Sequence, residues 1–149
     1  MFTVLVLKFK NRESVISFIL SLSSDKRFFK CILSFYDAYM ELHTFDISDY
    51  NIQKLALHVR IDELCILSLI DTDIKLQEIG KKILNRAKVL HVSYRAPIRL
   101  LEGRNLIEMG MKPSKAFSEL LELAFEAQLK GEFDNIEDAL EWLKYKGYF

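Results

Sequence analysis

Two aspartates, Asp71 and Asp73, have the spacing that most resembles a catalytic metal site. Alternating carboxylates hold the metal ions of nucleotidyl-transfer enzymes, where they lie on a strand beside a glycine-rich loop. No such loop is present here, and the pair falls at the predicted end of a helix. We therefore expect a structural or helix-capping role for both aspartates. The sequence predicts no catalytic residue, no metal site and no cofactor.

The other residues with chemical potential are scattered. His43, His58 and His91 stand singly, with neither an HExxH motif nor a His-Asp dipeptide. Cys31 and Cys65 lie in apolar helical patterns at no metal-type spacing, so we expect both to be buried, reduced thiols. The sequence also lacks P-loop, GxGxxG, GxSxG and CxxC motifs. An independent enzyme, such as a phosphohydrolase remnant in the first half, is therefore disfavoured.

A binding site is better supported than an active site. The turn from Gly110 to Pro113 leads into a predicted helix, whose free N–H groups and dipole favour an anion. Lys112 and Lys115 flank this end, and Arg104 precedes it by about one turn. These residues suit an RNA phosphate bound without sequence preference. The alternative is a helix–turn–helix corner whose lysines only keep the protein in solution.

Charge is distributed unevenly along a chain whose net charge is zero. Residues 75–115 carry 10 Lys/Arg and 3 Asp/Glu, a balance of +7. The segment before them has 8 and 10, and the segment after them has 3 and 8, giving −2 and −5. A basic middle between acidic ends predicts a surface that binds a polyanion. A basic helix face that is merely solvated is the alternative.

Helical spacing accounts for most of the chain. Apolar residues recur at helical intervals from Asn11 to Leu22, and a second helix follows the break at residues 23–25. This second helix is apolar nearly all round, so we expect it to be central and buried. Two more helices are predicted to follow between Ser48 and Ile70, and residues 75–90 form a basic amphipathic helix. Residues 4–9 could form a strand or a helix end.

In the last third of the chain, glycine, proline and capping residues mark where helices begin and end. Gly110 is placed to end a short helix in the left-handed conformation, and Pro113 fits the first turn of the next one. That helix should stop at Gly131. A final helix is capped by Asp134 with Glu137, or by Asn135 with Asp138.

The fold class is all-α, a compact multi-helix bundle. We take Pro97 as the boundary and expect a helical body at 1–95 and a smaller helical tail at 96–149. No apolar run reaches the roughly 18 residues that span a bilayer, and the first nine residues lack the features of a signal peptide. We therefore expect a cytoplasmic protein with no membrane partner.

The tail contains a long run of residues at fixed spacing, namely Gly103, Leu106, Ile107, Gly110, Pro113, Phe117, Leu121, Gln128, Leu129, Gly131, Ala139, Leu140 and Leu143. This run resembles the C-terminal region of bacterial tRNA nucleotidyltransferases, the CCA-adding enzymes, and their poly(A) polymerase relatives. Further matches upstream are Leu55, Ala56, Val59, Leu64, Leu67 and one of Asp71 or Asp73. The resemblance covers residues 50–149 and implies an all-helical body and tail that grip tRNA.

The chain departs from that family in two respects. The motifs of the family's catalytic head are missing, so the chain alone is not expected to add nucleotides. Lys112-Pro113-Ser114 also stands where the family usually has proline followed by glycine, which weakens a close backbone approach to phosphate.

The sequence thus favours a non-catalytic tRNA-binding module of a tRNA nucleotidyltransferase. Its expected partners are tRNA and a separate catalytic nucleotidyltransferase chain or domain. The predicted phosphate-binding residues are Lys81, Lys82, Arg86, Lys88, Arg95, Arg99, Arg104, Lys112 and Lys115. The alternative is a protein–protein interaction module, a degenerate remnant of the family that docks or forms homo-oligomers through its helix faces.

Overall fold

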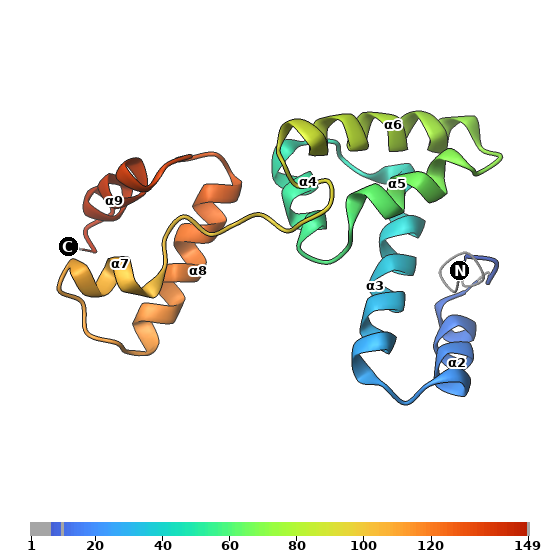
Figure 1. The fold of residues 1–149 in the computed structure, drawn as a ribbon, viewed down its shortest axis with the longest axis horizontal. Helices are drawn as coiled ribbons and strands as arrows, with labels where there is room; N and C mark the ends of the chain where they lie inside the picture. Colours follow the sequence, from blue (N-terminus) through green and yellow to red (C-terminus); the bar gives the residue numbers. More distant parts are fainter. Residues whose placement is uncertain (1–6, 10, 149) are drawn as a thin grey trace. The chain divides into compact units, whose positions relative to one another are not determined.

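The computed structural model describes residues 7–9 and 11–148, and all regular secondary structure in this part of the chain is helical (Figure 1). The all-α prediction is therefore confirmed. The chain divides into two compact units, residues 1–97 and 98–149. The elements are α2 (Arg12–Leu22), α3 (Lys26–Glu41), the 3-10 helix η1 (Leu42–Thr44), α4 (Asp49–Ala56), α5 (Ile61–Leu69), α6 (Ile74–Val89), α7 (Gly103–Glu108), α8 (Lys115–Leu129) and α9 (Ile136–Tyr145).

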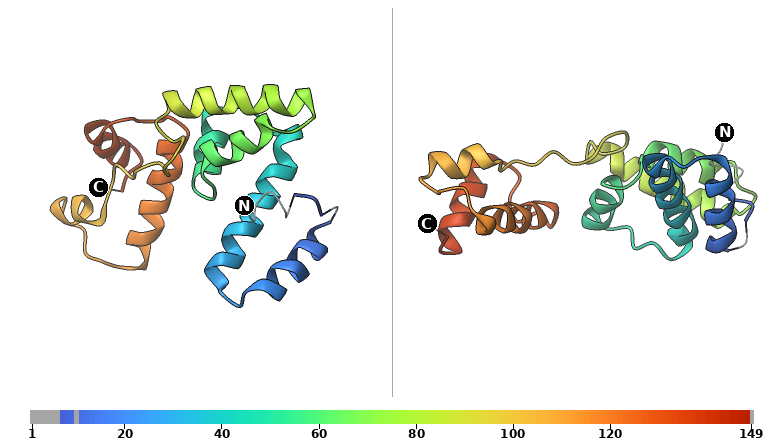
Figure 2. Two further views of the ribbon diagram at one scale, coloured as in Figure 1. Left: turned by 45° about the vertical axis from the view of Figure 1, so that its right-hand side comes forward. Right: turned by 90° about the horizontal axis from the view of Figure 1, so that it is seen from below.

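The first unit begins with a hairpin of α2 and α3, seen from two further directions in Figure 2. Asn11 caps α2 by accepting a hydrogen bond from the Ser14 amide at 2.8 Å, and Asp25 caps α3 in the same way. Their inner faces form a small core of Val15, Ile19, Ile32 and Tyr36. The alternatives for residues 4–9 fall mostly outside the described residues.

Helix α3 belongs to two cores, because its apolar side chains point in more than one direction. Ile32 and Tyr36 face α2, whereas Phe35 packs into the larger core built by α4, α5 and α6. The prediction of a buried thiol is wrong for Cys31, which is exposed on α3, as is Met40 of the same helix. The prediction is confirmed for Cys65, which lies on α5 within the larger core.

The close approach of α5 and α6 organises the larger core. Gly80 on α6 lies directly against Ser68 on α5, and a Cβ added at Gly80 would stand 1.8 Å from the Ser68 hydroxyl oxygen. Ser68 is fully buried, and its hydroxyl donates to the Cys65 carbonyl at 2.7 Å. With serine at position 68, only glycine at position 80 allows this spacing, since an added Cβ would clash with the Ser68 hydroxyl.

Replacing Gly80 with Ala should lower the free energy of unfolding of the first unit by about 1–3 kcal/mol, because overpacking outweighs the gain in helix propensity. Denaturant unfolding followed by far-UV circular dichroism measures this loss. Faster reaction of the buried Cys65 thiol with a maleimide gives a second reading. The double variant Ser68→Ala/Gly80→Ala removes the clashing oxygen and should recover most of the stability. Full stability in Gly80→Ala alone would contradict the proposed contact.

The second unit is built from α7, α8 and α9 around a core that includes Leu106, Leu120, Ala124 and Leu143. The final helix is capped by Asn135, whose side chain accepts from the Asp138 amide at 2.9 Å. This confirms the second of the two predicted capping pairs.

Four helices end in the same motif, with a left-handed residue after the helix. Gly110, Gly131 and Gly147 hold this position at the ends of α7, α8 and α9, with φ of 91°, 77° and 78°. His91 holds it after α6, with φ of 58°, although a side chain disfavours this conformation. In each motif the next amide donates to the carbonyl five residues back. The predicted roles of Gly110 and Gly131 are thus confirmed.

Pro113 does not lie in the first turn of α8, so that prediction is wrong. The helix begins at Lys115, with Ser114 as its extended N-cap residue and Pro113 one position earlier. Ser114 makes no side-chain capping bond, and its extended backbone (φ −155°, ψ 175°) makes Lys115 the first helical residue.

In the described part of the chain, no helix is both long and apolar enough to cross a membrane.

Gln128 on α8 holds the segment that leads into α7. Its side-chain oxygen accepts from the Leu100 amide at 2.9 Å, and its side-chain nitrogen donates to the Ile98 carbonyl at 2.8 Å. This one side chain thus supplies the hydrogen-bond partners that the backbone of an extended segment otherwise lacks.

Replacing Gln128 with Leu should lower the free energy of unfolding of the second unit by about 1–2 kcal/mol, because both backbone groups lose their partner. Trp142 lies in this unit and is the chain's only tryptophan, so its fluorescence reports this transition selectively. Gln128→Glu retains the acceptor and should lose about half as much. Equal stability of all three proteins would show that water satisfies the Leu100 amide and the Ile98 carbonyl as well as Gln128 does.

Candidate nucleic-acid interface

Asp71 and Asp73 form a structural network at the start of α6. Asp73 caps the helix by accepting from the Lys75 amide at 2.9 Å, and Asp71 accepts from the Asp73 amide at 2.9 Å. The Tyr39 hydroxyl donates to Asp71 at 2.6 Å, and this bond lowers the pKa of Asp71. Burial, together with the same contact, raises the pKa of Tyr39. The expected structural and capping role of the two aspartates is therefore observed.

The described residues contain no cluster of three or more His, Cys, Asp or Glu side chains that could hold a metal ion. His43 approaches Asp73 at 3.6 Å, on the surface.

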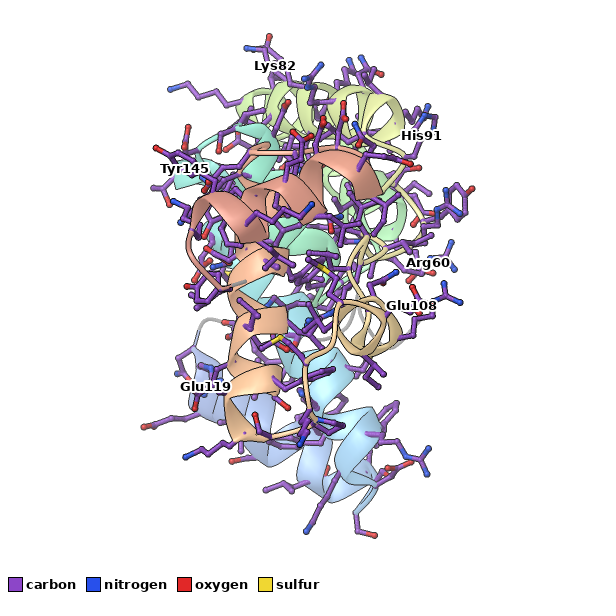
Figure 3. The ribbon with its side chains drawn as sticks, turned by 90° about the vertical axis from the view of Figure 1, so that its left-hand side faces the viewer. Arg60, Lys82, His91, Glu108, Glu119 and Tyr145 are labelled. Carbon is purple, nitrogen blue, oxygen red and sulfur yellow. The ribbon has the colours of Figure 1, made fainter. Side chains whose placement is uncertain are left out.

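The outer face of α6 carries the first group of predicted phosphate-binding residues. Leu76, Ile83 and Ala87 face the core, so the helical repeat turns Lys81, Lys82 and Lys88 outward, and all three are exposed. Figure 3 shows Lys82 projecting from this helix into solvent. Within the described residues these three lysines form no ion pair. Their charges are therefore available to an anionic partner.

Arg86 lies on the same helix, but its charge is already matched. Its guanidinium makes a two-pronged contact with the carboxylate of Asp49, the first residue of α4. The Arg86 hydrogen bond is the main reason that the pKa of Asp49 is lowered. Planar guanidinium and carboxylate groups match in geometry, so Arg86 is held against α4.

Arg95 follows α6 and stands over the ring of Tyr94, with 5.6 Å from its guanidinium carbon to the ring centroid. Its Nε also donates to the His91 carbonyl at 3.3 Å. No carboxylate of the described chain pairs with it, so Arg95 joins the available cations.

Two arginines of the second unit have carboxylate partners. Arg99 binds both oxygens of Glu122, at 2.8 and 2.9 Å, and its guanidinium lies over Phe125 at 4.3 Å from the ring centre. Arg104 contacts Glu102 at 3.2 Å. Arg99 therefore helps to fasten the entering segment to α8, a role that its sequence position did not indicate.

Lys112 and Lys115 flank the turn between α7 and α8, as the sequence predicted, and both are exposed. Neither forms an ion pair with another described residue. Ser114 between them makes no side-chain capping bond, so the first turn of α8 keeps amide groups that its N-cap side chain does not use.

The predicted set therefore divides according to its partners. Lys81, Lys82, Lys88 and Arg95 in the first unit, and Lys112 and Lys115 in the second, have no carboxylate partner among the described residues. Arg86, Arg99 and Arg104 are paired within the chain.

Comparison with known proteins gives one partial match. A stretch of 45 residues, 30% of this chain, is 49% identical to the A-adding tRNA nucleotidyltransferase of Halalkalibacterium halodurans and covers 10% of that protein. The matched stretch thus spans about a tenth of the length of its relative. No protein-family model matches the chain. No solved structure matches it either. The similarity supports a distant relationship to this enzyme.

The state of Arg86 can be tested through its partner. In the intact protein, the pKa of Asp49 should lie below the ordinary aspartate value of about 3.9, and in Arg86→Met it should return toward that value. Side-chain carboxyl shifts in an NMR pH titration measure both. Because the folded pKa is lowered, the pair stabilises the protein above the unfolded pKa and loses this effect as pH falls through the folded value. An ordinary Asp49 pKa in the unaltered protein would show that Arg86 is not paired with Asp49 and is available to an anionic partner.

Proposed function

We propose that this chain is a tRNA-binding helical module, related to tRNA nucleotidyltransferases and non-catalytic by itself. The observation that carries this proposal is the 45-residue stretch at 49% identity to an A-adding tRNA nucleotidyltransferase. The exposed, unpaired lysines give it a physical basis. On this proposal, nucleotide addition at the 3′ end requires a separate catalytic nucleotidyltransferase chain or domain.

Binding would rest mainly on phosphate contacts. Lysine ammonium groups bind phosphates as mobile point charges, and each contact releases counterions from the RNA. Lys81, Lys82 and Lys88 would make these contacts from α6, and Lys112 and Lys115 from the α7–α8 turn. Such contacts hold RNA without reading its sequence, as a protein acting on all tRNAs requires.

Arg86, Arg99 and Arg104 would bind phosphate only by exchanging a carboxylate for it. We therefore assign them a weaker contribution than the lysines, although all three belong to the set predicted from sequence. Arg99 would lose the most interactions in such an exchange, since its guanidinium also lies over the Phe125 ring.

The test is binding of the purified chain to total tRNA at about 50 and 200 mM salt, with duplex DNA as competitor. We expect a salt-sensitive complex that prefers tRNA. The variant Lys81→Ala/Lys82→Ala/Lys88→Ala should weaken binding at least tenfold and reduce the slope of log affinity against log salt by about 2–3, as each lost phosphate contact contributes about 0.9. Lys112→Ala/Lys115→Ala should weaken binding to all tRNAs alike.

A matched control is the variant Lys8→Ala/Lys26→Ala/Lys30→Ala, which removes the same charge from exposed positions away from α6. It should stay within about twofold of the unaltered protein. Equal losses of tRNA affinity in both triple variants would show that binding depends on net charge and not on the position of the lysines. Absence of tRNA binding at the lower salt concentration would refute the proposed function.

A second candidate is a protein–protein interaction module that pairs with itself or another chain. Ile66 and Ile70, spaced to share one helix face, and Ile74 at the start of α6 are 54%, 68% and 70% exposed. Large apolar side chains gathered at one helix corner are typical of contact surfaces. A mass that rises with concentration, together with absent tRNA binding, would favour this candidate.

A further inference from the structure

The first unit contains a cleft of about 330 Å³ that the sequence did not reveal. Helix α3, the turn between α4 and α5, and the segment after α6 meet there. Its lining residues are Cys31, Phe35, Ala56, Leu57, His58, Val59, Arg60, Glu63, Tyr94, Arg95 and Ala96. They come from separate parts of the sequence, so no local motif could have identified them.

The inner wall of the cleft is apolar and packed. Phe35, Ala56 and Val59 belong to the main core and are less than a tenth exposed. A wall held by the core keeps its shape without a ligand. It offers a preformed apolar surface to a flat, poorly solvated group.

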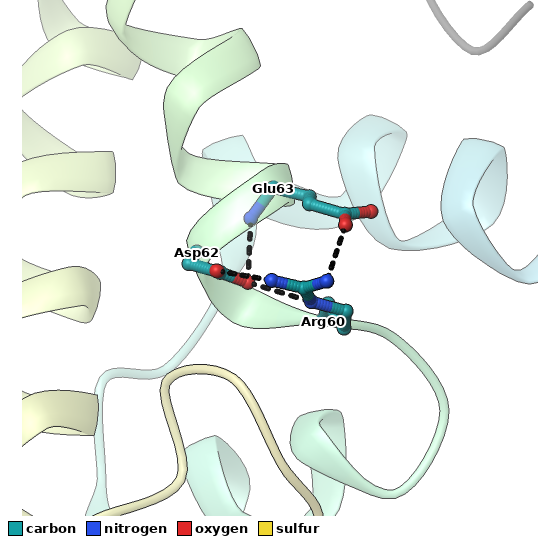
Figure 4. Close-up of polar contacts among 3 residues, drawn as sticks. All are labelled: Arg60, Asp62 and Glu63. Carbon is teal, nitrogen blue, oxygen red and sulfur yellow. Dashed lines mark hydrogen bonds and ion pairs between the residues drawn. The ribbon is translucent and has the colours of Figure 1, made fainter.

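Arg60 stands at the rim with its hydrogen-bonding edge fully engaged (Figure 4). Its Nε and one terminal nitrogen bind Asp62 at 3.2 and 2.7 Å, and the other terminal nitrogen binds Glu63 at 2.9 Å. The Arg60 contact lowers the pKa of Asp62, so the pair persists at neutral pH. A guanidinium fixed by its edge in this way retains its planar faces for stacking.

Tyr94 and Arg95 form the side of the cleft that follows α6. The backbone there is anchored, because Val92 and Ser93 are buried and the Ser93 carbonyl accepts from the Asp62 amide at 2.8 Å. The Tyr94 side chain is nevertheless 60% exposed, and Arg95 has no carboxylate partner among the described residues. An exposed aromatic ring beside an unpaired cation is suited to a base and its phosphate.

We propose that this cleft binds a single unpaired nucleotide of an RNA strand. The base lies against the apolar wall and stacks on Tyr94, and the phosphate contacts Arg95. Arg60 presents its planar face to the base. This inference extends the proposed RNA-binding function from phosphate contacts on α6 to recognition of an unpaired base.

The charges of the cleft favour a nucleotide over a helix of a protein partner. Arg60 is already engaged by Asp62 and Glu63, so Arg95 is the cation of the lining that has no carboxylate partner among the described residues. This unpaired guanidinium complements a phosphate.

The cleft contains its own reporter. Cys31 lines it and is exposed, whereas burial raises the pKa of the Cys65 thiol to about 12 and keeps that thiol protonated. Reaction of the folded protein with a maleimide should therefore label Cys31 selectively. A ligand in the cleft should slow that reaction.

The experiment measures the rate of Cys31 labelling on the full chain with increasing adenosine monophosphate or single-stranded hexa-adenylate. We expect saturable protection by both, with hexa-adenylate effective at lower concentration. Tyr94→Leu, which keeps an apolar side chain but removes the ring, and Arg95→Gln should each weaken protection about fivefold or more. The matched controls Tyr145→Leu and Lys144→Gln, exposed positions of the second unit outside the cleft, should leave protection unchanged.

Binding of total tRNA is measured on the same samples, so the two proposals can fail separately. Salt-dependent tRNA binding without any protection of Cys31 by the nucleotides would overturn the cleft inference and leave the proposed function standing. Protection lost equally in the cleft variants and their controls would also overturn it. Protection by adenosine monophosphate without tRNA binding would support the cleft and refute the proposed function.

Discussion

The close contact between Gly80 and Ser68 is the constraint on which the rest of the first unit depends. It sets the distance between α5 and α6, and so fixes which side of α6 is buried and which carries Lys81, Lys82 and Lys88. The same helix ends at the left-handed His91, which turns the chain back so that Ser93 bonds the start of α5. The lysine-bearing face and one wall of the cleft therefore both follow from how α6 is seated.

Within the predicted phosphate-binding set, carboxylates of the described chain pair with three of the arginines and with none of the lysines. Arg12, Arg60 and Arg86 each form a two-pronged contact with an acidic side chain, and one Arg99 nitrogen binds both oxygens of Glu122. A planar guanidinium can match a carboxylate with two parallel bonds, whereas an ammonium gains less from being fixed. A count of basic residues along the sequence thus overstates the charge available to an anionic partner. The lysines of the predicted set are the better guide to the proposed binding surface.

The proposed phosphate contacts are shared between the two units. Lysines at separate places contribute nearly independently to RNA affinity, since ionic screening limits each interaction to about 10 Å at ordinary salt. Each unit can therefore hold phosphates without a continuous basic surface. The cleft adds a contact of another kind, because stacking on a ring depends little on salt. A module combining both could engage paired and unpaired parts of one RNA.

The sequence by itself determined the helices and most of their ends. Asn11, Asp25, Asp73 and Asn135 cap helices through bonds to amides two or three residues away, and Gly110 and Gly131 terminate them equally locally. Such signals depend on neighbours in the chain and can be read without the fold. Even so, α8 begins two residues after Pro113, which the proline signal did not predict.

Only the tertiary structure decided which charges are free, which cysteine is exposed and where a cleft forms. Arg86 and Asp49 are 37 residues apart, and Arg99 and Glu122 are 23 apart. Whether such groups meet depends on how helices cross. In the first unit that geometry is set by side-chain volumes in the core, above all by the missing side chain at Gly80.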